Sequence, residues 1–368
     1  MILILMPFHA MGSVTGSLAW MTFKFLIIVF IFTVTLKMVQ NNSPPLPDWA
    51  VILVLILSIR VFASDLTHGN VNLVIGGLVV LSLYCSYCRK EFLSGLAIGL
   101  AAVLKVTPAL FLPYFIYKKR WSSVAGTLAG IFLFAWLIPG LILGFSFNHQ
   151  LMAEWYRQMI LPFVSGMPVG YMQTQYMNQS FTGLFFRLFS DSTAIAADTG
   201  DAFNDLKINF MSLDHQTVSL MVKGASLGIV ACLALLCRTP GTRPEHQGNI
   251  GEYAIVFLAM LLLSERSWKH HYVLLILSHS FLFYYLLITN PAGWRRYLPM
   301  VLMILAVVLH NFTSSFLFGD YWSDVLEAYG VHVIGILFLF AGCGIALNTL
   351  QVREDTGQNS ITKKSVPI

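Results

Sequence analysis

The sequence predicts an all-α fold, a polytopic transmembrane helical bundle, from three observations. Hydrophobic residues make up 57% of the 368 residues and charged residues only 11%, whereas a soluble domain has roughly 25% charged residues. Apolar runs recur along the whole chain, and many approach the roughly 20 residues that a helix needs to cross a bilayer. The runs are continuous rather than alternating, which favours helices over the strands of a membrane barrel. We therefore expect one transmembrane domain over residues 1–368, with about nine spans and a hairpin of two half-helices.

The apolar runs give the expected helices in order, separated by loops that carry polar or basic residues. These helices cover residues 18–38, 49–64, 71–88, 92–117, 122–145, 219–237, 249–263, 271–289, 297–318 and 329–350. Residues 146–218 form a long polar insertion within the same domain.

The segment 92–117 is expected to be the hairpin. Arg89 and Lys90 precede it and Lys118–Arg120 follow it, and short basic loops lie on the cytoplasmic side of a membrane. A full span between these clusters would place them on opposite sides. Proline disfavours helix in the residue before it, so Lys105–Pro108 marks the tip between two half-length helices. Such a break is tolerated at membrane depth where it lines a cavity.

With the hairpin in place, the remaining loops divide consistently between the two sides. The cytoplasmic loops then carry Arg238, Arg243, Arg295 and Arg296, and the basic tail lies on the same side. The extracytoplasmic segments are Asp65–Asn70, the insertion 146–218, Ser264–His271 and the acidic loop Gly319–Glu327.

Counting the spans back from these loops places Met1–Ser17 outside, with no preceding helix to carry this segment there. Met1–Gly12 is too short to span, and it lacks the basic start and small-residue cleavage site of a signal peptide. Either the tail crosses unaided or a first helix is missing from this chain, and we favour the second.

Four polar sites collect on the expected outer face. They are DLTHGNVN (65–72), YMNQSFTGLFFRLF (176–189), SERSWKHH (264–271) and Lys105. Charges facing lipid cost several kcal/mol, so such residues normally line a functional cavity, and we expect one cavity near the interface. Each site also has an ordinary alternative, namely turn and cap residues at 68–70 and 178–180, an interface tryptophan at Trp268, and a snorkelling lysine.

The adjacent histidines His270 and His271 do not predict a metal site. Neighbouring residues on a helix point about 100° apart, whereas a zinc-binding helix places histidines at positions i and i+4. No third ligand at a suitable spacing is nearby. Hydrogen bonding to an anion suits two imidazoles better.

Together these segments resemble glycosyltransferase family 87, whose members have the GT-C fold and use polyprenyl-phosphate sugars, as in the mycobacterial mannosyltransferases. The family pattern G-Q-x-N, K-x-x-P, N-Q-S and S-P-x-S-W-x-H-H is similar to Gly69–Asn72, Lys105–Pro108, Asn178–Ser180 and Ser264–His271. The resemblance covers roughly residues 65–275. Asn70 replaces the usual glutamine and Glu265 the usual proline, which affects the expected shape of the site.

The resemblance implies an inverting hexosyltransferase in a bacterial inner (plasma) membrane, with its active site on the extracytoplasmic face. Its partners would be the bilayer, a polyprenyl-phosphate-linked sugar donor, and a lipid or glycan acceptor. The resemblance implies that the sugar is mannose. We expect no cofactor, no metal and no nucleic-acid partner. The substrate-binding residues implied are His68, Asn70, Asn72, Lys105, Asn178, Gln179, Ser180, Arg266, Trp268, Lys269, His270 and His271.

The catalytic residue is unknown at this stage. Family members carry a catalytic aspartate in the first extracytoplasmic loop, and by this resemblance we expect the chain to begin after that loop. Asp65 and Glu265 are weak substitutes. Two alternatives therefore stay open: an inactive truncated remnant, and a secondary transporter, which would show internal pseudo-symmetry and polar residues near the bilayer midplane.

Overall fold

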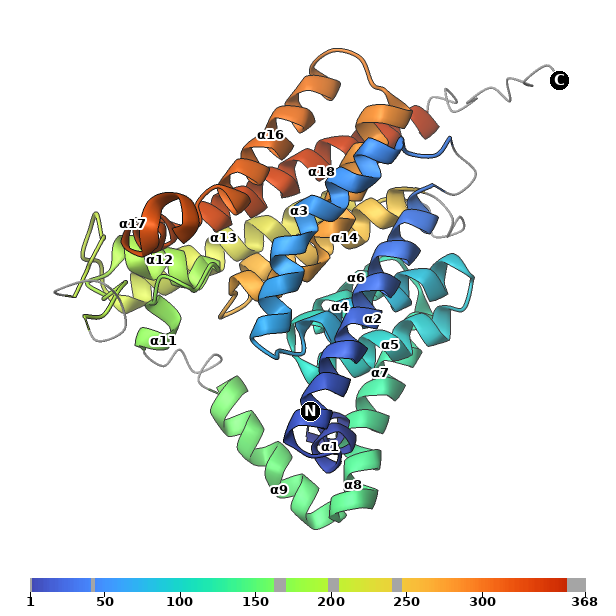
Figure 1. Cartoon of the computed structure of the whole chain (residues 1–368), viewed down its shortest axis with the longest axis vertical. Coiled ribbons are helices and arrows are strands. Elements are labelled where there is room, and N and C mark those ends of the chain that lie inside the picture. The colour runs from blue at the N-terminus through green and yellow to red at the C-terminus, as the bar shows by residue number, and fades with distance from the viewer. Residues whose placement is uncertain (1, 41–43, 162–169, 198–204, 240–246, 356–368) are drawn as a thin grey trace.

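The computed structural model is a bundle of helices, and the part of the chain that it describes contains no β-strand beyond an isolated bridge between Ile195 and Leu206 (Figure 1). It describes residues 2–40, 44–161, 170–197, 205–239 and 247–355. The α-helices are α1 (Ile2–Ala10), α2 (Ser13–Val39), α3 (Asp48–Thr67), α4 (Asn72–Tyr87), α5 (Glu91–Leu104), α6 (Phe111–Tyr117), α7 (Trp121–Ile131), α8 (Ile138–Leu143), α9 (Phe145–Trp155), α11 (Tyr171–Thr174), α12 (Phe181–Phe189), α13 (His215–Leu236), α14 (Gln247–Leu263), α15 (Leu275–Tyr284), α16 (Trp294–Asn311), α17 (Ser315–Ala328) and α18 (Val331–Asp355). The 3₁₀ segments are η1 (Thr107–Leu110) and η4 (Lys269–Leu274), and the π segments are η2 (Phe132–Leu137), η3 (Tyr156–Ile160) and η5 (Tyr285–Thr289).

The helix lengths confirm an all-α polytopic bundle. Six helices in the described residues are long and apolar enough to cross a membrane, or seven if the bent pair α16–α17 is counted as one span. The expected spans 71–88 and 249–263 correspond to α4 and α14, which are apolar but only 16 and 17 residues long. The expected nine spans are therefore reached only if the bent pair and these two shorter helices are all counted.

The expected hairpin forms between α5 and α6. Helix α5 ends at Leu104, Lys105 is extended (φ −155°, ψ 131°), and the chain continues through η1 into α6. At the other end, Arg120 Nη1 donates to Ser86 Oγ (2.8 Å) and Ser123 Oγ donates to Glu91 Oε2 (2.5 Å). The start and the end of the hairpin thus lie side by side, so its two basic flanks are at the same end of the bundle.

A buried network fixes that base to α14. Lys118 Nζ pairs with Glu252 Oε1 (2.9 Å), and Tyr114 Oη donates to Glu252 Oε2 (2.7 Å). Arg120 Nη2 also donates to Asn249 Oδ1 (2.9 Å). A buried carboxylate is stable only when it is paired and hydrogen-bonded, and Glu252 meets both conditions.

Helix α5 packs on α7 through glycines that bring the two backbones together. A Cβ atom on Gly95 would lie 1.9 Å from the Ser123 carbonyl oxygen, and one on Gly126 would lie 2.1 Å from the Phe92 carbonyl oxygen. Gly99 and Gly130 follow four residues later on the same faces and are also in close approach. Paired small residues at this spacing are typical of tight helix packing in membranes. This packing holds the hairpin, and with it Lys105, against a long helix.

The prediction that Gly319–Glu327 form an acidic loop is wrong, because these residues belong to α17. The axis of α17 is bent by 90° from α16. Asp320, Asp324 and Glu327 recur at helical spacing. Phe316 and Trp322 on the same helix are highly exposed, at 94% and 60%. A helix turned out of the bundle direction with exposed aromatic residues is typical of the membrane interface.

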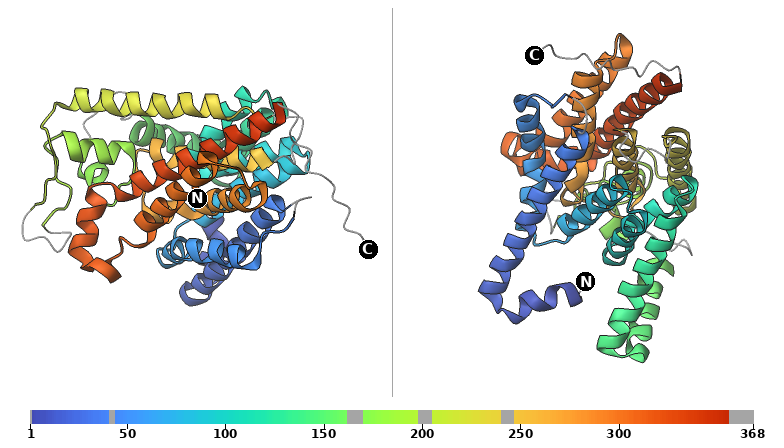
Figure 2. Two further views of the ribbon diagram at one scale, coloured as in Figure 1. Left: turned by 90° about the horizontal axis from the view of Figure 1, so that it is seen from above. Right: turned by 90° about the vertical axis from the view of Figure 1, so that its right-hand side faces the viewer.

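Two further segments flank the bundle. The nine-residue α1 folds back on α2, where the rings of Phe8 and Trp20 meet edge to face at 5.2 Å. Helix α9 turns back at Gly144 (φ 88°), and the bent pair α8–α9 extends away from the bundle (Figures 1 and 2). The insertion 146–218 is therefore partly helical rather than a continuous polar loop.

Candidate active site

A cavity of about 730 Å³ opens at the tip of the hairpin. One wall is apolar and comes from the hairpin and α14, with Leu104, Leu110 and Leu263 among its residues. Polar residues form most of the rest of the lining, which we call the polar wall. Residues of the sequence-predicted site that line it are Asn70, Lys105, Glu265, Arg266, Trp268, His270 and His271. We call this space the large cavity.

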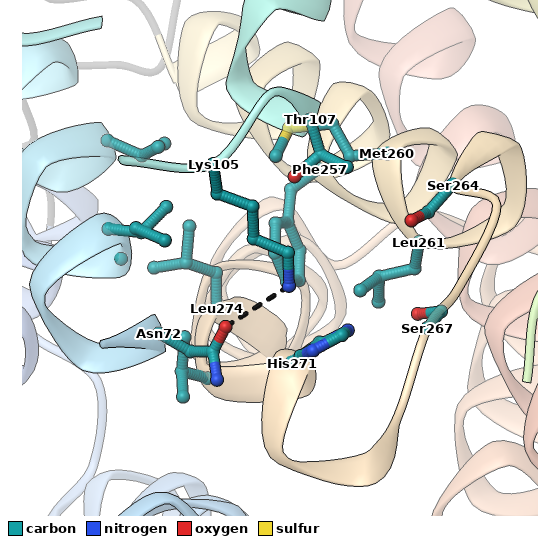
Figure 3. A pocket seen from close by; sticks show the side chains of 14 residues that line it. Asn72, Lys105, Thr107, Phe257, Met260, Leu261, Ser264, Ser267, His271 and Leu274 are labelled. Carbon is teal, nitrogen blue, oxygen red and sulfur yellow. Dashed lines mark hydrogen bonds between the residues drawn. The ribbon is translucent and has the colours of Figure 1, made fainter. Parts of the chain in front are cut away.

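A narrow inner pocket continues from the large cavity into the bundle. Lys105, Ser264 and His271 line both spaces, and Asn72 and Ser267 line the inner pocket alone (Figure 3). Lys105 and His271 therefore lie at the junction of the two spaces, where both can meet one ligand.

The 3₁₀ geometry of η4 sorts the side chains of this segment onto separate faces. A 3₁₀ helix has three residues per turn, so side chains at i and i+3 eclipse. Trp268 and His271 share a face on the large cavity, and His270 lies on that side as well. Lys269 and Tyr272 share another face and line a different, smaller cavity.

Hydrogen bonding fixes the tautomer of His271. The backbone N–H of Trp268 donates to His271 Nδ1 at 3.0 Å. Because Nδ1 accepts this bond, the neutral imidazole carries its proton on Nε2. His271 therefore presents an N–H donor to the junction of the two spaces.

Lys105 is oriented by a chain of polar contacts. Its Nζ donates to Asn72 Oδ1 (3.2 Å; Figure 3), and Asn72 Nδ2 donates to Asp65 Oδ2 (3.0 Å). Lys24 Nζ completes the chain, with an ion pair to Asp65 Oδ1 (2.6 Å) and a hydrogen bond to the Asp65 carbonyl oxygen (2.6 Å). The charges of Asp65 and Lys24 compensate each other, so Lys105 has no carboxylate partner of its own in this chain of contacts.

The two carboxylate candidates differ in position. Asp65 has a fully buried side chain, held by Lys24 and Asn72, and it lines neither of the two spaces. Glu265 lines the large cavity, where its Oε1 accepts a hydrogen bond from Gln173 Nε2 at 2.8 Å. Of the two, Glu265 is the carboxylate that a substrate in the large cavity could reach.

Asn178, Gln179 and Ser180 lie behind the polar wall rather than on it. All three are fully buried, and none lines the large cavity or the inner pocket. Asn178 Nδ2 donates to the Glu265 carbonyl oxygen (2.9 Å), and its Oδ1 accepts from the Ser267 N–H (2.9 Å). Ser180 Oγ also donates to the Glu265 carbonyl oxygen (3.2 Å), and the Gln179 N–H donates to the Ser267 carbonyl oxygen (2.6 Å). These residues hold the irregular backbone that leads into Trp268.

Two of the other predicted residues lie off the lining of the large cavity. His68 is exposed, and its ring lies 5.3 Å from that of His270. Lys269 points to another face of η4, where its Nζ pairs with Glu327 Oε1 at 2.5 Å. By contrast, Trp268 has a buried indole N–H with no acceptor among the described residues, and its ring contributes to the large cavity.

Sequence reasoning missed Lys24 and Ser267. A lysine inside a 27-residue apolar helix is itself a signal, because an intramembrane charge needs a partner. Ser267 lines the inner pocket, and its buried hydroxyl has no partner among the described residues. Among all the residues that the structure describes, no group of three or more His, Cys, Asp or Glu side chains could hold a metal ion.

The chain is similar to known membrane glycosyltransferases. The model of glycosyltransferase family 87 matches residues 1–264. A polyprenol-phosphate-mannose-dependent alpha-(1-2)-phosphatidylinositol pentamannoside mannosyltransferase of Mycolicibacterium smegmatis is 31% identical over 218 residues, which cover 58% of this chain and 42% of the relative. Its counterpart in Mycobacterium tuberculosis is 27% identical over 228 residues, which cover 62% and 43%.

A third relative has a different name. An alpha-(1->3)-arabinofuranosyltransferase of Corynebacterium glutamicum is 33% identical over 98 residues, which cover 25% of this chain and 23% of the relative. The chain thus spans less than half the length of these curated relatives. No solved structure matches it.

Proposed function

Because the chain belongs to glycosyltransferase family 87, we propose that it transfers a sugar from a polyprenyl-phosphate donor to a lipid or glycan acceptor. Mannose is the proposed sugar, since two relatives are named for dependence on polyprenol-phosphate-mannose. We propose that the transfer inverts the anomeric carbon and takes place at the extracytoplasmic face of a bacterial inner membrane.

The observation that carries this proposal is the pairing of an apolar wall with cationic and donor groups in one cavity. A polyprenyl-phosphate sugar has an apolar tail and an anionic head, so its site needs both surfaces. The apolar residues of the hairpin and α14 suit the start of the tail. Lys105 and Arg266 supply positive charge for the phosphate, and His271 supplies a donor at Nε2.

In the proposed reaction, an acceptor hydroxyl oxygen forms a bond to the anomeric carbon while the bond from that carbon to the phosphate oxygen breaks. The bond pair leaves with polyprenyl phosphate, whose growing charge is stabilised by fixed donors and cations. Lys105 and His271 are placed for that role. The hydroxyl proton needs a carboxylate within hydrogen-bond reach, and we assign Glu265 as this base.

The proposed sidedness rests on the two ends of the hairpin. Lys118–Arg120 lie at its base, and Lys105 lies at its tip. Helix α5 has 14 residues, so about 21 Å separates the two levels. Basic clusters favour the cytoplasmic side, which supports an extracytoplasmic position for the large cavity.

The test is sugar transfer in membranes that contain the chain, with radiolabelled polyprenyl-phosphate mannose as donor and extracted lipid as readout. We expect Lys105→Met to lower transfer by about 100-fold or more, as for the loss of a group that stabilises a developing anion. Lys223→Met is the matched control, because Lys223 is exposed on α13. Absence of transfer by the unaltered chain, or uptake of sugar without transfer, would overturn the proposal.

Glu265→Gln separates the base from general binding. Loss of a general base costs about 10²–10⁴-fold in rate, and donor binding should persist. Normal transfer by this variant would remove Glu265 from the reaction.

A further inference from the structure

A second cavity, of about 110 Å³, lies on the other face of η4. Its walls come from α3, η4, α15, α16 and α18, which are far apart in the sequence. The polar residues that matter here are Arg60, Tyr272, His279, His310 and His332. We call this space the Arg60 cavity.

Several buried polar groups in the Arg60 cavity have no partner among the described residues. These are the Tyr272 hydroxyl, both ring nitrogens of His279 and Nδ1 of His310. Tyr272 and His279 are 2% and 1% exposed. Leaving a buried polar group unsatisfied costs stability, so their convergence on one cavity indicates that a polar ligand completes them.

The charges around the cavity favour an anion. Arg60 Nη1 donates to the carbonyl oxygens of His310 (2.7 Å) and Asn311 (3.0 Å), and carbonyls do not neutralise its charge. Lys269 is matched by Glu327, whose Oε1 also lies 3.8 Å from His332 Nε2. When the imidazoles are neutral, the charges of Lys269 and Glu327 cancel. The charge of Arg60 then leaves the surroundings of the cavity with a net positive charge.

A phosphate group fits this chemistry best. The volume equals roughly three to four water molecules, which suits a compact group of a few atoms. A tetrahedral phosphate accepts hydrogen bonds from several directions, as a guanidinium, a hydroxyl and imidazole N–H groups around one cavity would supply. The neighbouring surfaces of α3 and α16 are apolar, with Ile59 57% and Phe312 55% exposed. Such a rim suits a phosphate that is attached to lipid.

We propose that the Arg60 cavity is a binding site for a phosphate group, either the phosphodiester of a lipid head group or inorganic phosphate. The site is separate from the large cavity and does not depend on sugar transfer. Under the proposed function, residues on different faces of η4 would contact two different phosphate groups.

The test measures binding to the purified full chain in detergent, in a Lys105→Met background that weakens the phosphate site of the large cavity. The probes are inorganic phosphate, short-chain phosphatidylglycerol and the matching diacylglycerol without phosphate. Binding is followed by native mass spectrometry and by the ligand-dependent rise in melting temperature. We expect Arg60→Gln to weaken binding of a phosphate-bearing probe by about 10–100-fold, the loss typical of a charge-assisted hydrogen bond. Arg296→Gln, at an exposed arginine of α16, is the control.

Tyr272→Phe keeps the test decisive if Arg60→Gln fails to fold. The hydroxyl has no hydrogen-bond partner among the described residues, so its removal should leave the ligand-free melting temperature unchanged or higher and weaken binding by about 3–10-fold. Tighter binding of phosphatidylglycerol than of phosphate identifies a lipid head group, and equal binding identifies free phosphate. Equal affinity of the folded variants and the control, or diacylglycerol binding that depends equally on Arg60, would overturn the proposal.

Discussion

Replacing Lys24 and Asp65, singly and together, tests whether their ion pair positions the site or supplies its chemistry. Both side chains are fully buried, and their charged atoms are 2.6 Å apart. Lys24→Met leaves a buried carboxylate without its cation, and Asp65→Asn leaves a buried ammonium without its anion. Each single change should lower the free energy of unfolding by about 3–5 kcal/mol. The double variant removes both charges, and its substituted amide can still accept from Asn72, so we expect a loss of only about 1 kcal/mol.

The assay combines unfolding in detergent with sugar transfer in membranes. If the pair only positions Asn72 and Lys105, the double variant should regain both stability and most of the transfer that the single variants lose. Stability restored with transfer still down by 10³-fold or more would instead identify Asp65 as the base and refute our assignment of Glu265. Additive losses in the double variant would refute the ion-pair reasoning itself.

Two further changes test the His271 tautomer and the packing of the hairpin. In His271→Gln the amide nitrogen can occupy the place of Nε2, whereas in His271→Asn the amide reaches only the level of Nδ1. We therefore expect His271→Gln to transfer sugar at least about 10-fold faster than His271→Asn. The reverse order of rates would contradict the assigned tautomer. Gly126→Leu should destabilise the chain by about 1–3 kcal/mol or more, because its Cβ would lie 2.1 Å from the Phe92 carbonyl oxygen, and thermal unfolding measures the loss. Gly228→Leu is the control, since a Cβ there meets nothing within 4 Å, and equal losses at both positions would argue against the close α5–α7 packing.

The helical class and the hairpin could be predicted because they depend on quantities that a sequence carries directly. Hydrophobic run length determines which segments can span, and the basic clusters at 89–90 and 118–120 required a return to the same side. Lys105 and SERSWKHH were found for a similar reason, since isolated charges within apolar sequence stand out.

The remaining features depend on contacts that a linear reading does not contain. Asn178–Ser180 were expected on the cavity, but polar side chains also satisfy the backbone of an irregular segment, and the sequence does not distinguish these two uses. Residues 319–327 were assigned to a loop from their acidic content, although the spacing of Asp320, Asp324 and Glu327 already indicates a helix. The Arg60 cavity combines single residues from distant helices, none with an unusual local pattern.

The three-residue repeat of η4 also limits how this segment can vary among related chains. One turn of a 3₁₀ helix is completed by three residues, so one inserted or deleted residue rotates everything beyond it by about 120°. Such a change would move Tyr272 off the Arg60 cavity and redirect His271 away from Lys105, even if every amino-acid type were retained. We therefore expect the segment 268–272 to accept point substitutions more readily than any change in its length, and an alignment that opens a gap there to be misplaced.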